Sequence, residues 1–313
     1  MRVLLRVLAS VVTVLALIGA VRLVVSATDP SGVRRQLAFL RAELEGGADA
    51  DAQALFPEGY YFLNVLYGLT WVDLGHRGVE PERAADEAAW ALARVESPAG
   101  RAPFEAGAVP AYGVFYAGWT VDGSRGTSQA LIQRFLVDVD PVFAREQYLR
   151  FREEFLARPL GITPAIREYP HGVNGAGDVD SGPLLLGVSL STTVVALGAA
   201  RSQGDDPLAE ALAGFGEFAG IPFSTPGTKR YALGLVPIGD AFLAWSKTAR
   251  PWTVETPAAP DPAVSWWWRL PLLTLLFLIG AAPWSPVRRR IGMALWSPVR
   301  HTARRLAARR ANG

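Results

Sequence analysis

A glycine-rich loop at residues 169–183 contains the side chains best suited to chemistry. It reads Tyr-Pro-His-Gly-Val-Asn-Gly-Ala-Gly-Asp-Val-Asp-Ser-Gly-Pro, with Asp178 and Asp180 two positions apart among four glycines. Two carboxylates held close together repel each other, so one can keep its proton near neutral pH while the other stays ionised. The pair therefore predicts a general acid beside a charged partner.

The stretch after this loop predicts the element that positions the two aspartates. Residues 184–200 carry no charge, Pro183 suits the first position of a helix, and Ser181 or Gly182 suits the cap before it. We therefore expect a helix over 184–201 with both aspartates near its positive end. Its serines, threonines and small residues favour a buried inner helix over a membrane span.

Two other stretches place a carboxylate near aromatic side chains, and these supply the remaining site candidates. Glycoside hydrolysis needs two carboxyl groups roughly 5 to 9.5 Å apart, and the spacing of Asp178 and Asp180 does not guarantee that distance. Glu58 or Asp122 is therefore the predicted second catalytic carboxylate. The predicted ligand-binding residues are Tyr61, Asn64, Tyr116, Trp119, His171 and Asn174.

Other kinds of site fit this loop less well. The aspartates could simply cap the loop by accepting backbone N–H bonds, which stays open as a structural interpretation. A calcium loop of the EF-hand type would need glutamate where Ser189 stands. Neither a dinucleotide-binding glycine pattern, nor a nucleophile elbow, nor zinc-ligand spacing is found. We therefore expect no metal and no cofactor.

The remaining chain predicts an all-α domain. Apolar residues repeat at helical spacing between breaks of glycine and proline, and long strand-like alternation is missing. The expected helices cover residues 33–44, 48–55, 60–74, 82–95, 128–137, 143–157, 184–201, 207–219 and 238–246. Residues 111–119 fit a buried helix start or a short strand, and residues 99–110 a turn-rich stretch.

Both ends of the chain predict contact with a membrane. Residues 1–28 have a basic start and an apolar run, which fits a cleaved signal peptide or a retained anchor helix. Residues 266–284 begin with three tryptophans and are otherwise almost wholly apolar, as in a transmembrane helix. Residues 258–265 would form the linker before it, and residues 285–313 a basic cytoplasmic tail.

Charge is distributed as this topology requires. Residues 1–28 and 263–313 carry arginines and no acid, which leaves 19 basic and all 29 acidic residues between them, a net charge of −10. An acidic middle between basic ends indicates an extracytoplasmic domain with a cytoplasmic tail. It also argues against nucleic acid as a partner. The chain has no cysteine, so disulfides are excluded.

At three places the chain resembles an α/α-toroid protein, the barrel of helical hairpins found in many glycan-active enzymes and some terpene-modifying enzymes. The resemblance lies in residues 56–61 (Phe-Pro-Glu-Gly-Tyr-Tyr), 112–119 (Tyr-Gly-Val-Phe-Tyr-Ala-Gly-Trp) and 177–183 (Gly-Asp-Val-Asp-Ser-Gly-Pro), within residues 33–247. It implies a pocket lined by loop carboxylates and aromatics. The Asp-x-Asp pair is similar to the Asp-x-Asp-Asp of terpene cyclases, but Ser181 stands where the last aspartate would be.

The leading expectation is a membrane-anchored, extracytoplasmic α-helical domain over residues 29–257 that acts on or binds a cell-envelope glycan. If it is an enzyme, the carboxylates indicate acid/base chemistry of the glycoside hydrolase or lyase kind. Two alternatives stay open: a non-catalytic envelope interaction protein, and an enzyme acting on a lipid or isoprenoid. The expected partners are the lipid bilayer and one of these ligands.

Overall fold

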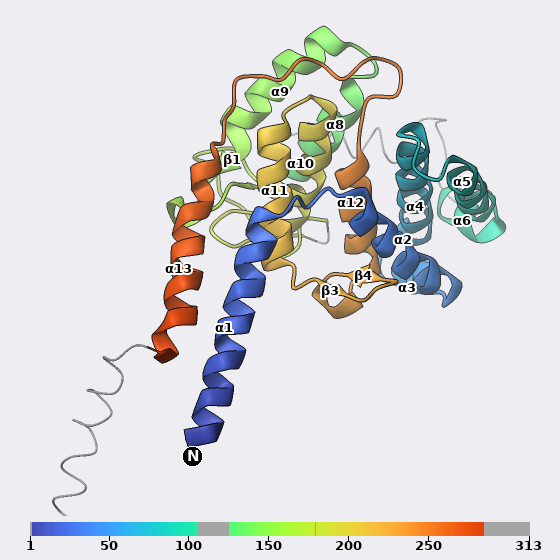
Figure 1. The fold of residues 1–313 in the computed structure, drawn as a ribbon. Helices are drawn as coiled ribbons and strands as arrows, with labels where there is room; N and C mark the ends of the chain where they lie inside the picture. Colours follow the sequence, from blue (N-terminus) through green and yellow to red (C-terminus); the bar gives the residue numbers. More distant parts are fainter. Residues whose placement is uncertain (1, 106–124, 179, 285–313) are drawn as a thin grey trace, which may run out of the picture. The chain divides into compact units, whose positions relative to one another are not determined.

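The computed structural model describes residues 2–105, 125–178 and 180–284 (Figure 1). It divides the chain into two compact units, one of residues 1–24 with 270–313 and one of residues 25–269. The expected residues Tyr116, Trp119 and Asp122 lie outside the described part of the chain, as does the stretch 111–119.

The larger unit is predominantly helical, which confirms the helical character predicted from the sequence. Its helices are α2 (Pro30–Glu45), α3 (Ala48–Leu55), α4 (Gly59–His76), α5 (Pro81–Val95), α6 (Pro98–Glu105), α8 (Gly126–Leu136), α9 (Pro141–Phe155), α10 (Leu190–Ser202), α11 (Asp206–Ala219) and α12 (Pro237–Thr248). Two antiparallel pairs of two-residue strands join β1 (Leu156–Ala157) to β2 (Ala165–Ile166) and β3 (Phe223–Ser224) to β4 (Lys229–Arg230).

Several helix starts are set by short polar side chains that satisfy free backbone N–H groups. The carboxylates of Asp29, Asp140 and Asp205 cap α2, α9 and α11, and the Ser189 hydroxyl accepts from the Thr192 N–H of α10 at 3.0 Å. Proline stands in the first turn of α2, α9 and α11. These local signals explain why the sequence placed most helix starts within a few residues.

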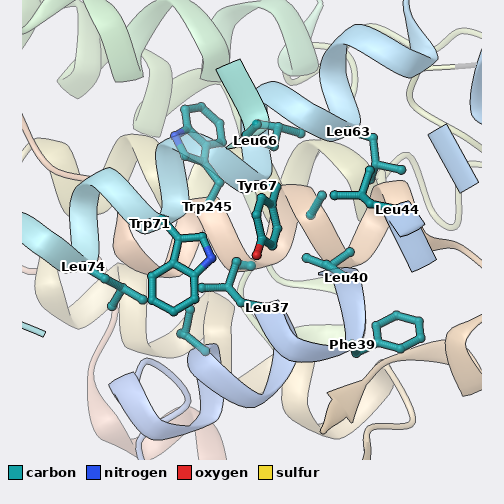
Figure 2. Packing of buried hydrophobic residues seen from close by; sticks show 14 of the residues in the cluster. Leu37, Phe39, Leu40, Leu44, Leu63, Leu66, Tyr67, Trp71, Leu74 and Trp245 are labelled. Carbon is teal, nitrogen blue, oxygen red and sulfur yellow. The ribbon is translucent and has the colours of Figure 1, made fainter. Parts of the chain in front are cut away.

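The hydrophobic core lies mainly between α2, α4, α5 and α12. Figure 2 shows Leu40 of α2, Trp71 of α4 and Trp245 of α12 packed in one cluster, and none of the three is more than 1% exposed. α4 contacts α5 on one side and α12 on another, and α10 contacts α12, α8 and α11. This succession of helices holds the loops that carry the candidate site.

The helix after the glycine-rich loop begins later than expected. α10 starts at Leu190 and not near residue 184, because a tight turn intervenes in which Leu186 and Gly187 take positive φ values of 54° and 78°. Asp178 and Asp180 are therefore not at its N-terminus. The prediction of a buried inner helix is confirmed, since most of α10 is buried. α6 was not foreseen, because residues 99–110 were interpreted as turns.

The extended segment after α12 is held along α9 in the larger unit (Figure 1). Arg152 Nη2 donates to the Asp261 carbonyl at 2.8 Å, and Arg158 Nη2 donates to the Ala263 carbonyl at 3.1 Å. Arg145 makes the equivalent bond to the Ala258 carbonyl. The stretch predicted as a linker, residues 258–265, is thus hydrogen-bonded to the domain at several points.

The smaller unit pairs α1 (Arg2–Val24) with α13 (Leu270–Ala281). Residues Val3–Val24 and Trp266–Trp284 are long and apolar enough to cross a membrane, with mean hydropathies of 2.4 and 1.2. Thr13 Oγ1 donates to the Gly280 carbonyl at 2.9 Å, and Trp284 Nε1 donates to Thr13 Oγ1 at 2.9 Å. A Cβ on Gly280 would lie 3.3 Å from Ala16 Cβ, so glycine permits the close contact.

Candidate functional site

Arg125, at the start of α8, contacts Asp178 and Ser181 of the glycine-rich loop and Glu168 just before it. Its Nε donates to Glu168 Oε1 at 2.9 Å, its Nη1 pairs with the Asp178 carboxylate, and its Nη2 donates to Ser181 Oγ at 3.3 Å. The guanidinium also lies 5.4 Å from the ring centre of Tyr169. We call Arg125, Glu168, Asp178, Asp180 and Ser181 the loop site.

Glu168 fixes the buried side of the loop site. Its carboxylate is 1% exposed, and Oε2 accepts hydrogen bonds from the Thr127 hydroxyl at 2.8 Å and from the Thr192 hydroxyl. Since Oε1 is taken by Arg125, both oxygens are occupied. Glu168 therefore anchors Arg125 and offers no free oxygen to a ligand.

Gly126 allows the start of α8 to approach this region. Its N–H donates to the Glu168 carbonyl at 2.8 Å, and a Cβ at this position would lie 2.2 Å from the Arg167 carbonyl oxygen. Any larger residue would push α8 away. Arg125 reaches Asp178, which lies 53 positions along the chain, because this glycine permits the contact.

The Asp178 carboxylate is ionised, and most of its hydrogen bonds come from its own loop. Oδ1 accepts bonds from the Asp180 N–H at 3.1 Å and from the Ser181 N–H and hydroxyl, each at 2.9 Å. Burial alone would raise the pKa of Asp178, but these Ser181 bonds and the Arg125 charge outweigh it and lower the pKa. The capping interpretation left open by the sequence thus describes part of what Asp178 does.

The pKa of Asp180 is shifted in the opposite direction from that of Asp178. It is exposed, and within the described residues its carboxylate makes no hydrogen bond or ion pair. Partial desolvation raises its pKa, and the negative charges of Asp178, Glu58 and Glu168 raise it further, against the pull of Arg125. The two aspartates are therefore pushed apart in pKa, which is the arrangement of an acid and an ionised partner.

Glu58 is the second predicted carboxylate that reaches this region. It precedes the first residue of α4, is half-buried, and lies close enough for its charge to act on Asp180. The structure therefore brings Glu58 and the aspartate pair into electrostatic contact, although they are more than 100 positions apart. The place of Asp122 falls outside the described residues.

The predicted ligand-binding residues within the described chain lie in different environments. The exposed His171 ring has its Nε2 3.0 Å from the Leu156 carbonyl oxygen. Asn174 is exposed, and its Oδ1 accepts a long bond from Arg167 Nη2 at 3.4 Å. Tyr61 is half-buried in the first turn of α4, three residues after Glu58.

Asn64 is fully buried and belongs to a packing network. Its amide donates to Asp49 Oδ2 at 2.7 Å and to the Tyr60 carbonyl at 2.9 Å, and its oxygen accepts from Arg94 Nε at 3.0 Å. These bonds join α3, α4 and α5. They favour a structural role for Asn64, with its polar atoms already occupied.

A second polar cluster, which sequence reasoning missed, surrounds Glu217 of α11. Glu217 Oε1 accepts from Lys229 Nζ at 2.7 Å, from Lys247 Nζ at 2.9 Å and from the Tyr231 hydroxyl. Lys247 also donates to the Tyr231 hydroxyl. We call these four residues the lysine cluster, and only Lys229 exceeds 10% side-chain exposure, at 11%.

Burial shifts the pKa of several groups in and beside the lysine cluster. It lowers the pKa of Lys247 to about 8, although Glu217 opposes the change. Burial alone would raise the pKa of Glu217, but Lys247 and Lys229 lower it to about 2. The neighbouring Asp240 accepts from Gln36 Nε2 at 3.1 Å and from the Tyr231 N–H, yet burial raises its pKa to about 7.

One sequence signal could have pointed to the lysine cluster. The chain has 31 basic residues, and only Lys229 and Lys247 are lysines. Both contact the same carboxylate oxygen. The compact ammonium of lysine differs from the planar guanidinium of arginine, so two lysines in an arginine-rich chain are a reason to look at their surroundings. Arg125 and Glu168 gave no such signal, because their partners are 24 or more positions away.

Within the described ranges, no group of three or more histidine, aspartate or glutamate side chains is arranged to hold a metal ion. Comparison of the whole chain with protein-family models and with the curated proteins gave no match.

Proposed function

We propose that this chain is a membrane-anchored protein whose helical domain lies outside the cytoplasm and acts on a cell-envelope glycan or a similar polar ligand. The observation that carries the proposal is the opposite pKa shift of the two loop aspartates, lowered in Asp178 and raised in Asp180. Asp180 is the member of the pair whose carboxylate has no partner among the described residues, and its raised pKa makes it the better proton donor of the two.

The proposed chemistry divides the work among the loop carboxylates. Asp180 would donate its proton to the leaving oxygen of a glycosidic bond, while Asp178, held by Arg125, stays ionised and keeps the pKa of Asp180 raised. Glu58, whose charge also acts on Asp180, is the proposed second carboxylate, which would take a proton from the water that attacks the anomeric carbon as the glycosidic bond breaks. The half-buried Tyr61 would supply an aromatic face for stacking.

The paired apolar helices support membrane anchoring. α1 and α13 are joined through Thr13 and Gly280, and removal of residues 1–28 would leave the Gly280 carbonyl and Trp284 without this partner. Unpaired polar groups are costly in lipid. We therefore infer that the N-terminal helix is retained. The acidic domain and the basic tail favour an extracytoplasmic domain. We propose that its helices form a toroid-like arrangement, as the sequence resemblance implies.

A non-catalytic role is the second candidate, because one observation favours it. Oδ1 of Asp178 accepts three hydrogen bonds from its own loop, so a large part of the observed geometry serves the shape of the loop. In that case the loop would present Asp180 to a protein or glycan partner without proton transfer.

The test measures the unfolding temperature of the full chain in detergent, with and without each compound of a panel of envelope sugars and isoprenoid alcohols. Hydrolysis or eliminative cleavage is then assayed on any glycan that stabilises the protein. Asp180→Asn removes the proton donor, and Asp86→Asn changes an equally exposed aspartate of α5 as a matched control. Loss of a proton donor slows such reactions by about 10²–10⁴-fold.

Three outcomes separate the candidates. A glycan that binds and is cleaved by the wild type and by Asp86→Asn, but not by Asp180→Asn, supports the enzyme. Binding without cleavage supports the non-catalytic role. Stabilisation by isoprenoids alone contradicts a glycan ligand and favours a lipid substrate.

A further inference from the structure

Exposed apolar side chains gather around the hairpin of β3 and β4, which connects α11 to α12 (Figure 1). Five large apolar residues of this stretch are between 47% and 79% exposed: Ile221, Phe223, Leu233, Leu235 and Val236. We call them the hairpin patch. Single exposed apolar residues are common on protein surfaces, but a group of them marks a place of contact.

Backbone hydrogen bonds bring the two arms of the hairpin patch together. The Ala232 N–H donates to the Gly220 carbonyl at 2.8 Å, and each of these two residues is followed directly by a member of the patch. The Leu235 N–H donates to the Ala232 carbonyl at 3.2 Å, and Phe223 is the register partner of Arg230 in the strand pair. The patch is therefore one surface and not a set of scattered residues.

Two members of the hairpin patch hold a backbone conformation that side chains rarely adopt. Ile221 and Leu233 have positive φ values of 47° and 60°. The left-handed region is disfavoured for residues with a Cβ, and most of all for a β-branched residue such as isoleucine. Conformations of this kind are concentrated at functional sites, where the surrounding structure holds them in place. Here they occur at two apolar side chains that stay exposed.

The charge around the hairpin patch is positive, in contrast to the rest of the domain. Residues 218–239 contain Lys229 and Arg230 and no acid, whereas residues 29–262 together carry a net charge of −10. Lys229 is paired within the lysine cluster, but Arg230 forms no ion pair in the described part of the chain. Apolar residues with a free positive charge beside them match a surface of anionic lipid.

Aromatic rings position the Arg230 side chain. Its guanidinium lies 5.1 Å from the ring centre of Phe223 and 5.9 Å from that of Phe39. Its buried Nε has no hydrogen-bond partner among the described residues. Arg230 therefore combines an apolar stem that lies along these rings with an unpaired charge, as basic side chains do at membrane surfaces.

The hairpin patch lies on the same helix as both ends of the larger unit. The chain enters this unit directly from α1 and leaves it directly into α13. At the entry, the Thr28 hydroxyl donates to Glu210 Oε1 of α11 at 2.7 Å. At the exit, a Cβ on Gly214 of α11 would lie 3.6 Å from the Trp268 ring. The patch begins just after Ala219, where α11 ends, about 14 Å along the helix from Glu210.

We propose that the hairpin patch lies in the head-group region of the bilayer that holds the anchor helices, so that the domain rests on the membrane surface. This inference rests on the membrane anchoring proposed above. The apolar side chains of the patch would enter the boundary between head groups and acyl chains, and Arg230 would meet lipid phosphate. Trp266 and Trp267, which are 50% and 69% exposed, would lie at the same interface.

A second group of exposed apolar residues provides the matched control. Val139 and Val142, at the start of α9, are 81% and 82% exposed, close to the 79% of Leu235. They stand beside Asp138 and Asp140, whose negative charge is repelled by an anionic lipid surface. The two groups are thus alike in exposure and differ in location and charge.

Fluorescent labels at single positions test the proposal, because the chain has no cysteine and each added cysteine is unique. Leu233→Cys and Leu235→Cys report on the hairpin patch, and Val142→Cys is the control. Leu275→Cys, at an exposed position of α13, reports on the anchor. Each labelled full-length variant is reconstituted into vesicles of phosphatidylcholine and phosphatidylglycerol that contain lipid with a nitroxide quencher at a shallow or a deep acyl position. Circular dichroism and thermal unfolding establish that each variant is folded.

The expected result is a loss of fluorescence at both patch positions that is larger with the shallow quencher, which corresponds to a depth of about 5–10 Å. The label of Leu275→Cys should be quenched more by the deep quencher, and that of Val142→Cys by neither. Quenching of the anchor label without quenching of the patch labels overturns the proposal and leaves the anchoring intact. Equal quenching of the patch and control labels also overturns it. An unquenched anchor label contradicts the membrane anchoring itself, and the proposal with it.

Discussion

The loop site and the lysine cluster are both built from carboxylates and cations, but they differ in how their acceptors are used. In the lysine cluster, one oxygen of Glu217 receives Lys229, Lys247 and the Tyr231 hydroxyl, and the group is almost wholly buried. In the loop site, Asp180 is exposed, and in the described chain its carboxylate has no partner. The charges of the lysine cluster pair with one another, and we expect them to stabilise the fold. The Asp180 carboxylate lies beside Asp178, which Arg125 holds, and it stays available for chemistry.

The largest expected effect comes from breaking the lysine cluster. Glu217→Ala leaves Lys247 buried without a counter-charge, so the free energy of unfolding should fall by roughly 3–5 kcal/mol. Urea unfolding of the full chain measures this. Glu146→Ala removes an exposed partner of Arg150 and should cost less than about 0.5 kcal/mol. Equal effects of the two substitutions would show that the lysine cluster does not stabilise the fold.

The second expected effect is on the pH dependence of stability and involves Asp240, beside the lysine cluster. Its pKa is raised from 3.8 to about 7, so the folded protein holds this proton more tightly than the unfolded chain does. The stability it contributes is present at acidic pH and is lost as the pH rises through about 7. Asp240→Asn removes this titration. The difference in stability between wild type and variant should therefore change between about pH 4.5 and 7.5, and a constant difference would contradict the raised pKa.

A smaller loss of stability is expected in the loop site from Ser181→Ala. The Ser181 hydroxyl is buried, accepts from the Asp178 N–H at 2.9 Å and donates to Asp178 Oδ1 at 2.9 Å. Its removal should cost about 1–2 kcal/mol and should raise the pKa of Asp178. Urea unfolding checks the first effect. Ser31→Ala, at a half-buried serine of α2 whose hydroxyl donates to Asp29, controls for the loss of a hydroxyl and should cost less than Ser181→Ala.

The smallest effect on stability is expected at the residue with the proposed chemical role. Asp180→Asn removes an exposed carboxylate without a partner in the described chain, so stability should change by no more than about 0.5 kcal/mol while activity is lost. Thermal unfolding and the cleavage assay are run on the same sample. A large loss of stability with activity retained in the folded fraction would assign Asp180 to the fold instead.

The sequence predicted the helices well where a local signal existed. Proline and aspartate at the starts of α9 and α11 placed these helices within a few residues, and the buried character of α10 followed from its uncharged sequence. The start of α10 was wrong because Pro183 was interpreted as a first helical residue. A turn at Leu186 and Gly187, which takes positive φ at both positions, lies between that proline and the helix.

The partners in the site could not be predicted in the same way. Arg125 contacts Glu168 and Asp178 over 43 and 53 positions, and no periodicity connects residues at such separations. The loop aspartates were found because glycine and acidic residues are concentrated there. Their unequal electrostatic states depend on Arg125 and Ser181, which only the folded arrangement brings to them.

The central claim is that the two loop aspartates have been pushed apart in pKa, and carbon-detected NMR titration of their carboxyl groups tests it most directly. The full chain is labelled at aspartate Cγ, and Asp178→Asn and Asp180→Asn assign the two signals. The account predicts that Asp178 titrates below the ordinary aspartate value of 3.8 and Asp180 above it. Titration of Asp180 at or below the pKa of Asp178 would contradict it.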